Sequence, residues 1–243
     1  MLRLWLISLF FFPVFQEKPD SRYEIPFEEL SERHREKSKS VMKGLTTTVP
    51  LPMTRVETDP EVYDFLLGEL PFTAAVCRII GKATYEVFRD PRIPEEEEKR
   101  QLWRNKYYLN DGKGMKLRVE RAFAEANRII FYTYGSYKMS GLPKIWGRSI
   151  IVVIWDQKED ILATEAKVFL QVTTAVFRTL AEMGKKIVER MVRKKSALFI
   201  QAAQWVAEAA RKDPEGLYEK ISDSKDIDPD VLKEFRRRFL QGN

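Results

Sequence analysis

One histidine and one cysteine, His34 and Cys77, supply all the imidazole and thiol in this sequence. Hydrolytic triads and most transition-metal sites need imidazole. His34 lies in a run of charged residues, 32–36, where we expect a solvent-facing structural role. Cys77 lies in an apolar stretch, which favours a buried thiol over a reactive one. We therefore expect no metal, no cofactor and no catalytic residue, with tyrosine and carboxylate chemistry left open.

Aromatic side chains are frequent in the expected strands and could line a binding site. Filling of an ordinary core is the alternative for each of them, because aromatic residues dominate protein interiors. A pocket for a hydrophobic molecule is mostly apolar and carries a few polar anchors. The candidate ligand-binding residues are Phe131, Tyr132, Tyr134, Arg148, Trp155 and Phe169 on the strands and Phe177, Leu180 and Met183 on the helix expected after them.

A basic stripe lies further along the same expected helix. Glu189 interrupts it and Lys195 continues it. A basic amphipathic helix can lie on an anionic membrane surface, and a simple solvated helix face is the alternative. The candidate membrane-surface residues are Lys185, Lys186, Arg190, Arg193 and Lys194.

The pattern of apolar residues predicts the helices and strands that must position these candidates. Asp59 and Pro60 are typical of a helix start. A second helix is expected over 72–80, ending at Gly81. A turn at 110–112 separates segments in which polar and apolar residues alternate. Strands are expected over 83–89, 116–120, 128–137, 149–155 and 162–171, and they form an antiparallel meander.

The longest periodic segment begins at Thr173 or Thr174 and reaches Lys212, with apolar residues at intervals of three and four. A helix of this span would be about 55 Å long at about 1.5 Å per residue, so we expect it to outreach the sheet or to kink. The expected organisation has four parts: a leader, 1–16; a loosely packed polar arm with one helix, 17–58; an α+β domain, 59–212; and a short helical tail, 213–243.

Residues 1–16 have one early basic residue, Arg3, followed by an apolar run. This pattern is typical of a secretory signal, and the run is shorter than the roughly twenty residues that span a bilayer. We expect export to the periplasm or the extracellular space. Residues 14–16 lack the small side chains that a signal peptidase prefers, so an uncleaved leader would tether the chain to a membrane. A core segment of a cytoplasmic protein is the alternative.

The composition is that of an ordinary globular protein, with 44% hydrophobic and 32% charged residues. The net charge of +6 is spread over 243 residues. So dilute an excess does not predict nucleic-acid binding, and we expect no nucleic-acid partner.

The order of a helix pair, antiparallel strands and one long C-terminal amphipathic helix over about residues 59–212 resembles the START-like, helix-grip superfamily of polyketide cyclases and lipid-transport proteins. A first strand before the helix pair is missing unless residues 46–56 supply it. The resemblance implies an α+β fold in which a curved antiparallel sheet grips the helix around an apolar cavity. It also implies a hydrophobic small molecule or lipid as the ligand. Together with the leader, this predicts an exported envelope protein that binds or carries such a ligand. A non-catalytic structural or interaction protein, docked on a membrane through the basic stripe, is the alternative.

Overall fold

A computed structural model describes residues 21–89, 105–125, 127–138, 143–174 and 182–240, and for 182–184 only the backbone. At its centre is one antiparallel sheet with strand order β1-β8-β7-β6-β5-β4-β3, and β2 also pairs with β8. The leader expected over 1–16 lies outside the described residues. The strands are β1 (Thr47–Pro50), β2 (Thr54–Glu57), β3 (Glu86–Arg89), β4 (Lys106–Asn110), β5 (Met115–Glu125), β6 (Arg128–Tyr137), β7 (Ile145–Lys158) and β8 (Ile161–Val172).

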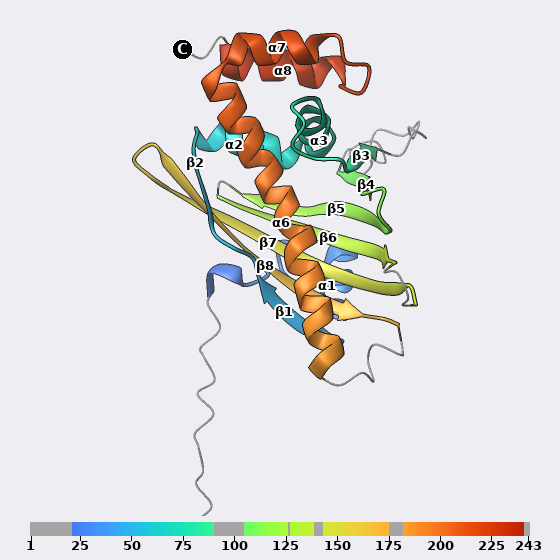
Figure 1. The fold of residues 1–243 in the computed structure, drawn as a ribbon. Helices are drawn as coiled ribbons and strands as arrows, with labels where there is room; N and C mark the ends of the chain where they lie inside the picture. Colours follow the sequence, from blue (N-terminus) through green and yellow to red (C-terminus); the bar gives the residue numbers. More distant parts are fainter. Residues whose placement is uncertain (1–20, 90–104, 126, 139–142, 175–181, 241–243) are drawn as a thin grey trace, which may run out of the picture.

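Helices cover both faces of the sheet (Figure 1). The long helix α6 crosses one face, called the inner face below, and α1 packs on the opposite, outer face. Among the described helices, none is both long enough and apolar enough to cross a membrane. The helices are α1 (Glu32–Lys43), α2 (Pro60–Gly68), α3 (Leu70–Ile79), α6 (Glu182–Lys212), α7 (Pro214–Ser222) and α8 (Pro229–Leu240), with a 3-10 turn η1 (Ser21–Tyr23) before them.

Local sequence signals explain how several elements begin and end. The Asp59 side chain accepts a hydrogen bond from the Glu61 amide at 2.7 Å, and Pro60 stands in the first turn, so α2 begins as expected. Gly112 and Gly114 have φ angles of +65° and +107°, which residues with a Cβ atom rarely adopt. They turn the chain between β4 and β5. The predicted antiparallel meander and the α+β fold class are confirmed.

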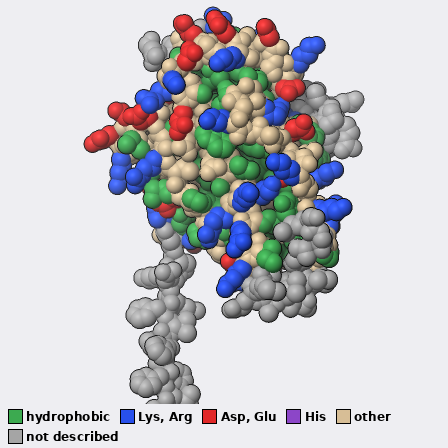
Figure 2. Space-filling model, viewed as in Figure 1, with side chains coloured by type: hydrophobic (Ala, Val, Ile, Leu, Met, Phe, Trp, Pro, Cys, Tyr) green, Lys and Arg blue, Asp and Glu red, His purple; other side chains and the backbone are tan. Residues whose placement is uncertain are grey.

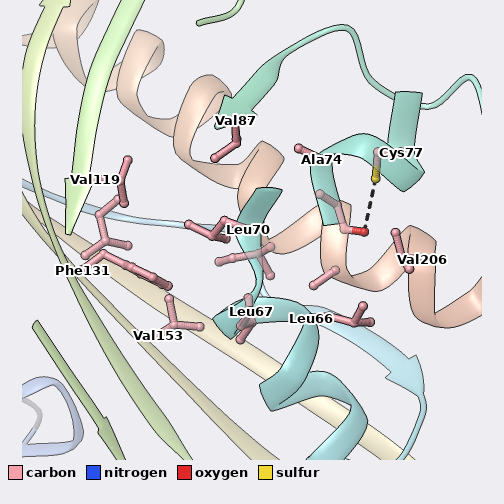
Figure 3. Packing of buried hydrophobic residues seen from close by; sticks show 14 of the residues in the cluster. Leu66, Leu67, Leu70, Ala74, Cys77, Val87, Val119, Phe131, Val153 and Val206 are labelled. Carbon is pink, nitrogen blue, oxygen red and sulfur yellow. Dashed lines mark hydrogen bonds between the residues drawn. The ribbon is translucent and has the colours of Figure 1, made fainter. Parts of the chain in front are cut away.

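The main core lies between the inner face and the helices α2, α3 and α6. Cys77 is fully buried there, and its thiol donates a hydrogen bond to the Ala202 carbonyl at 3.5 Å. Burial raises the pKa of this thiol to about 12, so the expectation of a buried cysteine is confirmed. Figure 3 shows part of this core, from Cys77 on α3 across to the sheet, with Leu66, Leu67, Leu70, Ala74, Val87, Val119, Phe131, Val153 and Val206 also labelled.

The N-terminal arm is packed, and the expectation of a loose arm is wrong. Residues 47–57 contribute β1 and β2 to the sheet, so they supply the strand that the helix-grip pattern requires before the helix pair. Residues 21–43 cover the outer face, where Tyr23, Ile25, Leu30 and Val41 are buried. The physical reason is that these few apolar side chains meet an apolar patch of β6 and β7 that the polar arm composition does not reveal.

His34 is also buried, contrary to the expected exposure. Its ring lies 3.2 Å from a Glu120 carboxylate oxygen and 3.0 Å from the Ser31 hydroxyl. A buried imidazole needs such partners, and the partner carboxylate comes from β5, far away in the sequence. His34 therefore fastens α1 to the sheet.

The described part of the long helix is Glu182–Lys212. Thr173 and Thr174 are not helical, because both bond to the Trp146 backbone beside the end of β8. The expected first turns after them lie outside the described residues. The tail expected to be helical, 213–243, holds two helices, α7 and α8; the N-cap of α7 is Asp213.

Candidate functional site

A cavity of about 80 Å³ lies between the inner face of the sheet and the N-terminal half of α6. Strands β5 to β8 form one wall. The helix contributes Val188, Met191, Val192, Lys195 and Ser196, whose intervals of three and four place them on one helix face. Most lining side chains are apolar, so the cavity accommodates a hydrophobic group.

An ion pair lies at one end of the cavity. The ammonium of Lys195 contacts the carboxylate of Asp111, and their side chains are only 15% and 4% exposed. The ammonium also lies 5.5 Å from the centre of the Tyr137 ring. Burial alone would raise the pKa of Asp111, but hydrogen bonds from Lys195 and from the Met115 and Lys113 amides lower it overall. The Asp111 carboxylate therefore stays ionised beside the Lys195 side chain, where the apolar wall ends.

Two hydroxyl groups form a second polar feature in the wall. Thr133 and Ser149 are register partners on β6 and β7, and their hydroxyl oxygens lie 2.6 Å apart. Both side chains are buried. One of the two hydroxyl protons makes the hydrogen bond between them, so the other hydroxyl can donate to a polar atom in the cavity.

A smaller hollow of about 10 Å³ continues the cavity along α6 toward Ile200. Thr133, Ile151 and Ser196 line both hollows, which shows that they are neighbouring parts of one interface. Pockets for small molecules usually enclose about 300–1,000 Å³. The cavity as it stands holds a few heavy atoms, and a larger ligand would have to move α6 away from the sheet.

The structure places two of the predicted strand residues on the inner face. Phe131 is buried and lines the smaller hollow. Trp155 is buried in the core, where its ring meets Tyr63 edge-on with 6.0 Å between ring centres. Phe131 therefore borders the candidate site, and Trp155 supports the core beside it.

The other predicted strand residues face the outer side of the sheet. Tyr132 and Phe169 pack beneath α1. Arg148 borders the cavity, but its guanidinium lies on the outer side, 3.4 Å from the Ser40 hydroxyl of α1. Tyr134 is 42% exposed on the same side. Successive side chains of a strand point to opposite faces, so these residues cannot share a cavity with Phe131. This corrects the expectation that one cavity collects them all.

The predicted helix residues divide into two groups. Phe177, Leu180 and the side chain of Met183 lie outside the described residues. Figure 2 shows Lys and Arg side chains gathered on the face of the molecule that carries α6. The exposed side chains of α6 include Lys185, Lys186, Arg190, Arg193 and Lys194.

Sequence reasoning missed the Lys195–Asp111 pair. Lys195 follows Val188 by seven residues, so helical spacing could have assigned it to the buried face and not to the basic stripe. Nothing in the sequence points to Asp111, because the pair joins positions 84 residues apart. Within the described part of the chain, no group of three or more His, Cys, Asp or Glu side chains could hold a metal ion.

No protein-family model matches this chain, and no curated protein sequence matches it. Three solved structures are similar in shape. A conserved protein from Geobacillus kaustophilus has 10% identity and a TM-score of 0.44, covering 67% of this chain and 95% of that one. Ara h 8.0201 has 9% identity and a TM-score of 0.42, covering 67% and 98%. The di-domain ARO/CYC protein BexL from the BE-7585A biosynthetic pathway has 14% identity and a TM-score of 0.42, covering 70% and 53%.

Proposed function

We propose that this protein binds a hydrophobic small molecule or lipid bearing one polar or anionic group, in the cavity between the sheet and α6. The observation that carries the proposal is an apolar wall that ends at the buried cation of Lys195. The antiparallel sheet and the long C-terminal helix that crosses it agree with the helix-grip pattern and support membership in the START-like superfamily. Once α6 has moved away from the sheet to admit a ligand of this size, the apolar part of the ligand contacts Val188 and Val192, and its anion contacts Lys195.

A dye with fused apolar rings and one sulfonate, 8-anilinonaphthalene-1-sulfonate, tests the proposal directly. Val188→Phe fills the cavity, so we expect at least about tenfold weaker dye binding, or about 1.4 kcal/mol. Ile187→Phe is the matched control, because Ile187 is the preceding residue and is 36% exposed. Equal dye binding by the two variants would overturn the proposal.

The cationic anchor needs a second pair of measurements. Replacing Lys195 alone would leave the Asp111 carboxylate buried without its partner, so the test variant is Lys195→Met with Asp111→Asn. We expect weaker binding of the sulfonate dye and unchanged binding of Nile red, which is neutral. Native mass spectrometry of the purified protein would then identify a co-purifying ligand by its mass, and its absence from wild type and variant alike would count against a retained lipid.

Contact with an anionic membrane through the basic stripe is a second candidate function, favoured by the exposure of five of its cations, Lys185, Lys186, Arg190, Arg193 and Lys194. Each cation near an anionic surface contributes about 1 kcal/mol to binding. A variant with glutamine at Lys185, Lys186, Arg193 and Lys194 should therefore no longer bind vesicles of phosphatidylserine and phosphatidylcholine. A control variant removes the same charge at other exposed lysines: Lys82, Lys113, Lys225 and Lys233. Retained vesicle binding by the stripe variant would exclude this function.

Export by residues 1–16 is a further part of the proposal, supported by Arg3 and the apolar run after it. An epitope-tagged chain expressed in a Gram-negative bacterium should reach the periplasm, and a chain lacking 1–16 should stay in the cytoplasm. The mass of the exported chain distinguishes a cleaved leader from a membrane tether. Recovery of both chains in the cytoplasm would refute export.

A further inference from the structure

The outer face of the sheet carries another and larger hollow, an open groove of about 370 Å³ over β3 to β7. Two pairs of stacked aromatic rings border it. The ring centres of Phe88 and Tyr108 lie 5.8 Å apart at an angle of 20°, and those of Tyr134 and Trp146 lie 5.8 Å apart at 30°. Three of these rings are notably exposed for aromatic side chains, with 47%, 42% and 39% of Phe88, Tyr134 and Trp146 accessible.

Strand β5 runs between the two ring pairs. Arg118 is the register partner of Tyr108 on one side and of Tyr134 on the other. The backbones of Tyr108 and Tyr134 therefore lie two strand spacings apart, about 9.6 Å. A planar ring makes contact on each of its faces at about 3.5 Å. The Arg118 guanidinium lies on the Tyr108 side of this space, 5.1 Å from the centre of the Tyr108 ring, and it donates a hydrogen bond to the Tyr108 hydroxyl at 2.7 Å. A further planar ring would therefore stack beside Arg118, on the exposed rings of Tyr134 and Trp146.

The groove is also strongly basic. Lys116, Arg118 and Lys144 line it, and Arg148 lies 6.0 Å from the Tyr134 ring. No aspartate or glutamate is among its lining residues, and within the described ranges none of the four cations forms an ion pair. The nearest strand carboxylates are Glu86, opposite Asn110 at the sheet edge, and Glu120, which the cations of α1 neutralise.

We propose that this groove binds a nucleotide unit, either free or as part of a single strand of nucleic acid. Aromatic side chains that stack on bases, combined with cations that contact phosphates, are the physical basis of single-strand binding. The groove brings both together on five adjacent strands. The average charge of the chain does not reveal this arrangement, because three cations line the groove and no aspartate or glutamate of the described residues does. The site lies on the opposite face from the cavity and does not depend on the cavity ligand.

Adenosine monophosphate and an octamer of deoxythymidylate are the probes, measured by titration calorimetry at low salt. Tyr134→Leu removes the stacking face, and we expect about 5- to 100-fold weaker binding. Tyr134→Phe keeps the ring and should bind like wild type. Because Tyr134 is exposed, both variants should unfold at the wild-type temperature, and this measurement separates lost binding from lost folding.

The electrostatic part is tested by salt dependence. The three lining cations predict a slope of about −2 for log affinity of the octamer against log salt, because each neutralised phosphate of a single strand contributes about −0.7. Lys116→Gln with Arg118→Gln should reduce the slope by about two thirds. Lys185→Gln with Lys186→Gln, which removes the same charge on α6, is the control and should leave it unchanged.

The outcomes separate the two sources of the nucleotide. If the octamer binds no more tightly than the monophosphate, the ligand is a free nucleotide. If only the octamer binds, the ligand is a single strand. Either result supports the site if Tyr134→Leu weakens the binding. The proposal is overturned if neither probe binds, or if Tyr134→Leu binds like Tyr134→Phe, or if the α6 control loses as much affinity as the groove variant.

Discussion

Glutamine in place of Glu120 should remove most of the acid sensitivity of folding. Glu120 on β5 is 2% exposed, and its carboxylate meets three side chains of α1: Lys37 at 2.5 Å, His34 at 3.2 Å and Arg33 at 3.3 Å. Burial alone would raise its pKa. The hydrogen bonds from His34 and Lys37, with the charges of Lys37 and Arg33, outweigh burial and lower the pKa to about 2.

The expected size of the effect follows from this pKa. The folded-state value of about 2 lies below the ordinary value of 4.5, and each unit corresponds to about 1.36 kcal/mol, so ionised Glu120 contributes roughly 3 kcal/mol to the free energy of unfolding. Because the folded-state pKa is the lower one, this contribution is complete above about pH 5. It is lost progressively as the pH falls toward 2.

Urea unfolding of wild type and Glu120→Gln at pH 6, 4 and 3 measures the effect. The variant should be less stable at pH 6, by about 3–5 kcal/mol, because Lys37 and His34 lose their buried partner. It should then lose much less stability than wild type between pH 6 and 3. The control is Glu234→Gln: hydrogen bonds from Arg237 and Arg238 lower the pKa of Glu234 to about 2, but solvent screens this surface group. A variant with the wild-type loss between pH 6 and 3 would refute the reasoning.

Three further predictions rest on single positions. The raised pKa and complete burial of Cys77 predict no reaction with a disulfide reagent at pH 8 until urea unfolds the chain; a prompt reaction would show that the thiol is accessible. Leu66→Ala should lower the free energy of unfolding by about 2–5 kcal/mol in urea, because Leu66 is fully buried; a loss below about 1 kcal/mol would contradict the packing. A Cβ at Gly135 would lie 2.1 Å from the Lys116 carbonyl, so Gly135→Ala should force β5 and β6 apart and lower the melting temperature, whereas a neutral result would mean that the strands adapt.

Local patterns were sufficient to predict most elements of the fold. The first turn of α2 and its N-cap follow from Asp59 and Pro60, and β6 has the predicted bounds, 128–137. The alternation of side chains and the turn at 110–112 are short-range properties, which the sequence expresses directly. The same holds for the face of α6 that meets the sheet, because its apolar residues recur at helical spacing.

The roles of the two sheet faces could not be predicted. Strand β6 is apolar on both sides, and only the position of α1 decides that Ile130 and Tyr132 are covered while Tyr134 is exposed. The contacts that hold α1 in place join Lys37 and His34 to Glu120 across more than 80 residues. A polar helix that is stabilised by one distant carboxylate has the local pattern of a solvated arm, which explains why the arm and His34 were predicted to be exposed.

The cavity and the groove share part of the sheet as a common wall, since Leu117, Gly135 and Ser136 line both. Gly135 has no side chain on either side, so the wall is only one backbone thick at that point. The side chains that would recognise each ligand nevertheless point in opposite directions, Val188 toward the inner face and Tyr134 away from it. Substitutions at sites without shared contacts usually act additively. Val188→Phe should therefore weaken dye binding without weakening nucleotide binding, and Tyr134→Leu should do the reverse. A loss of both by either variant would show that the sheet transmits the change.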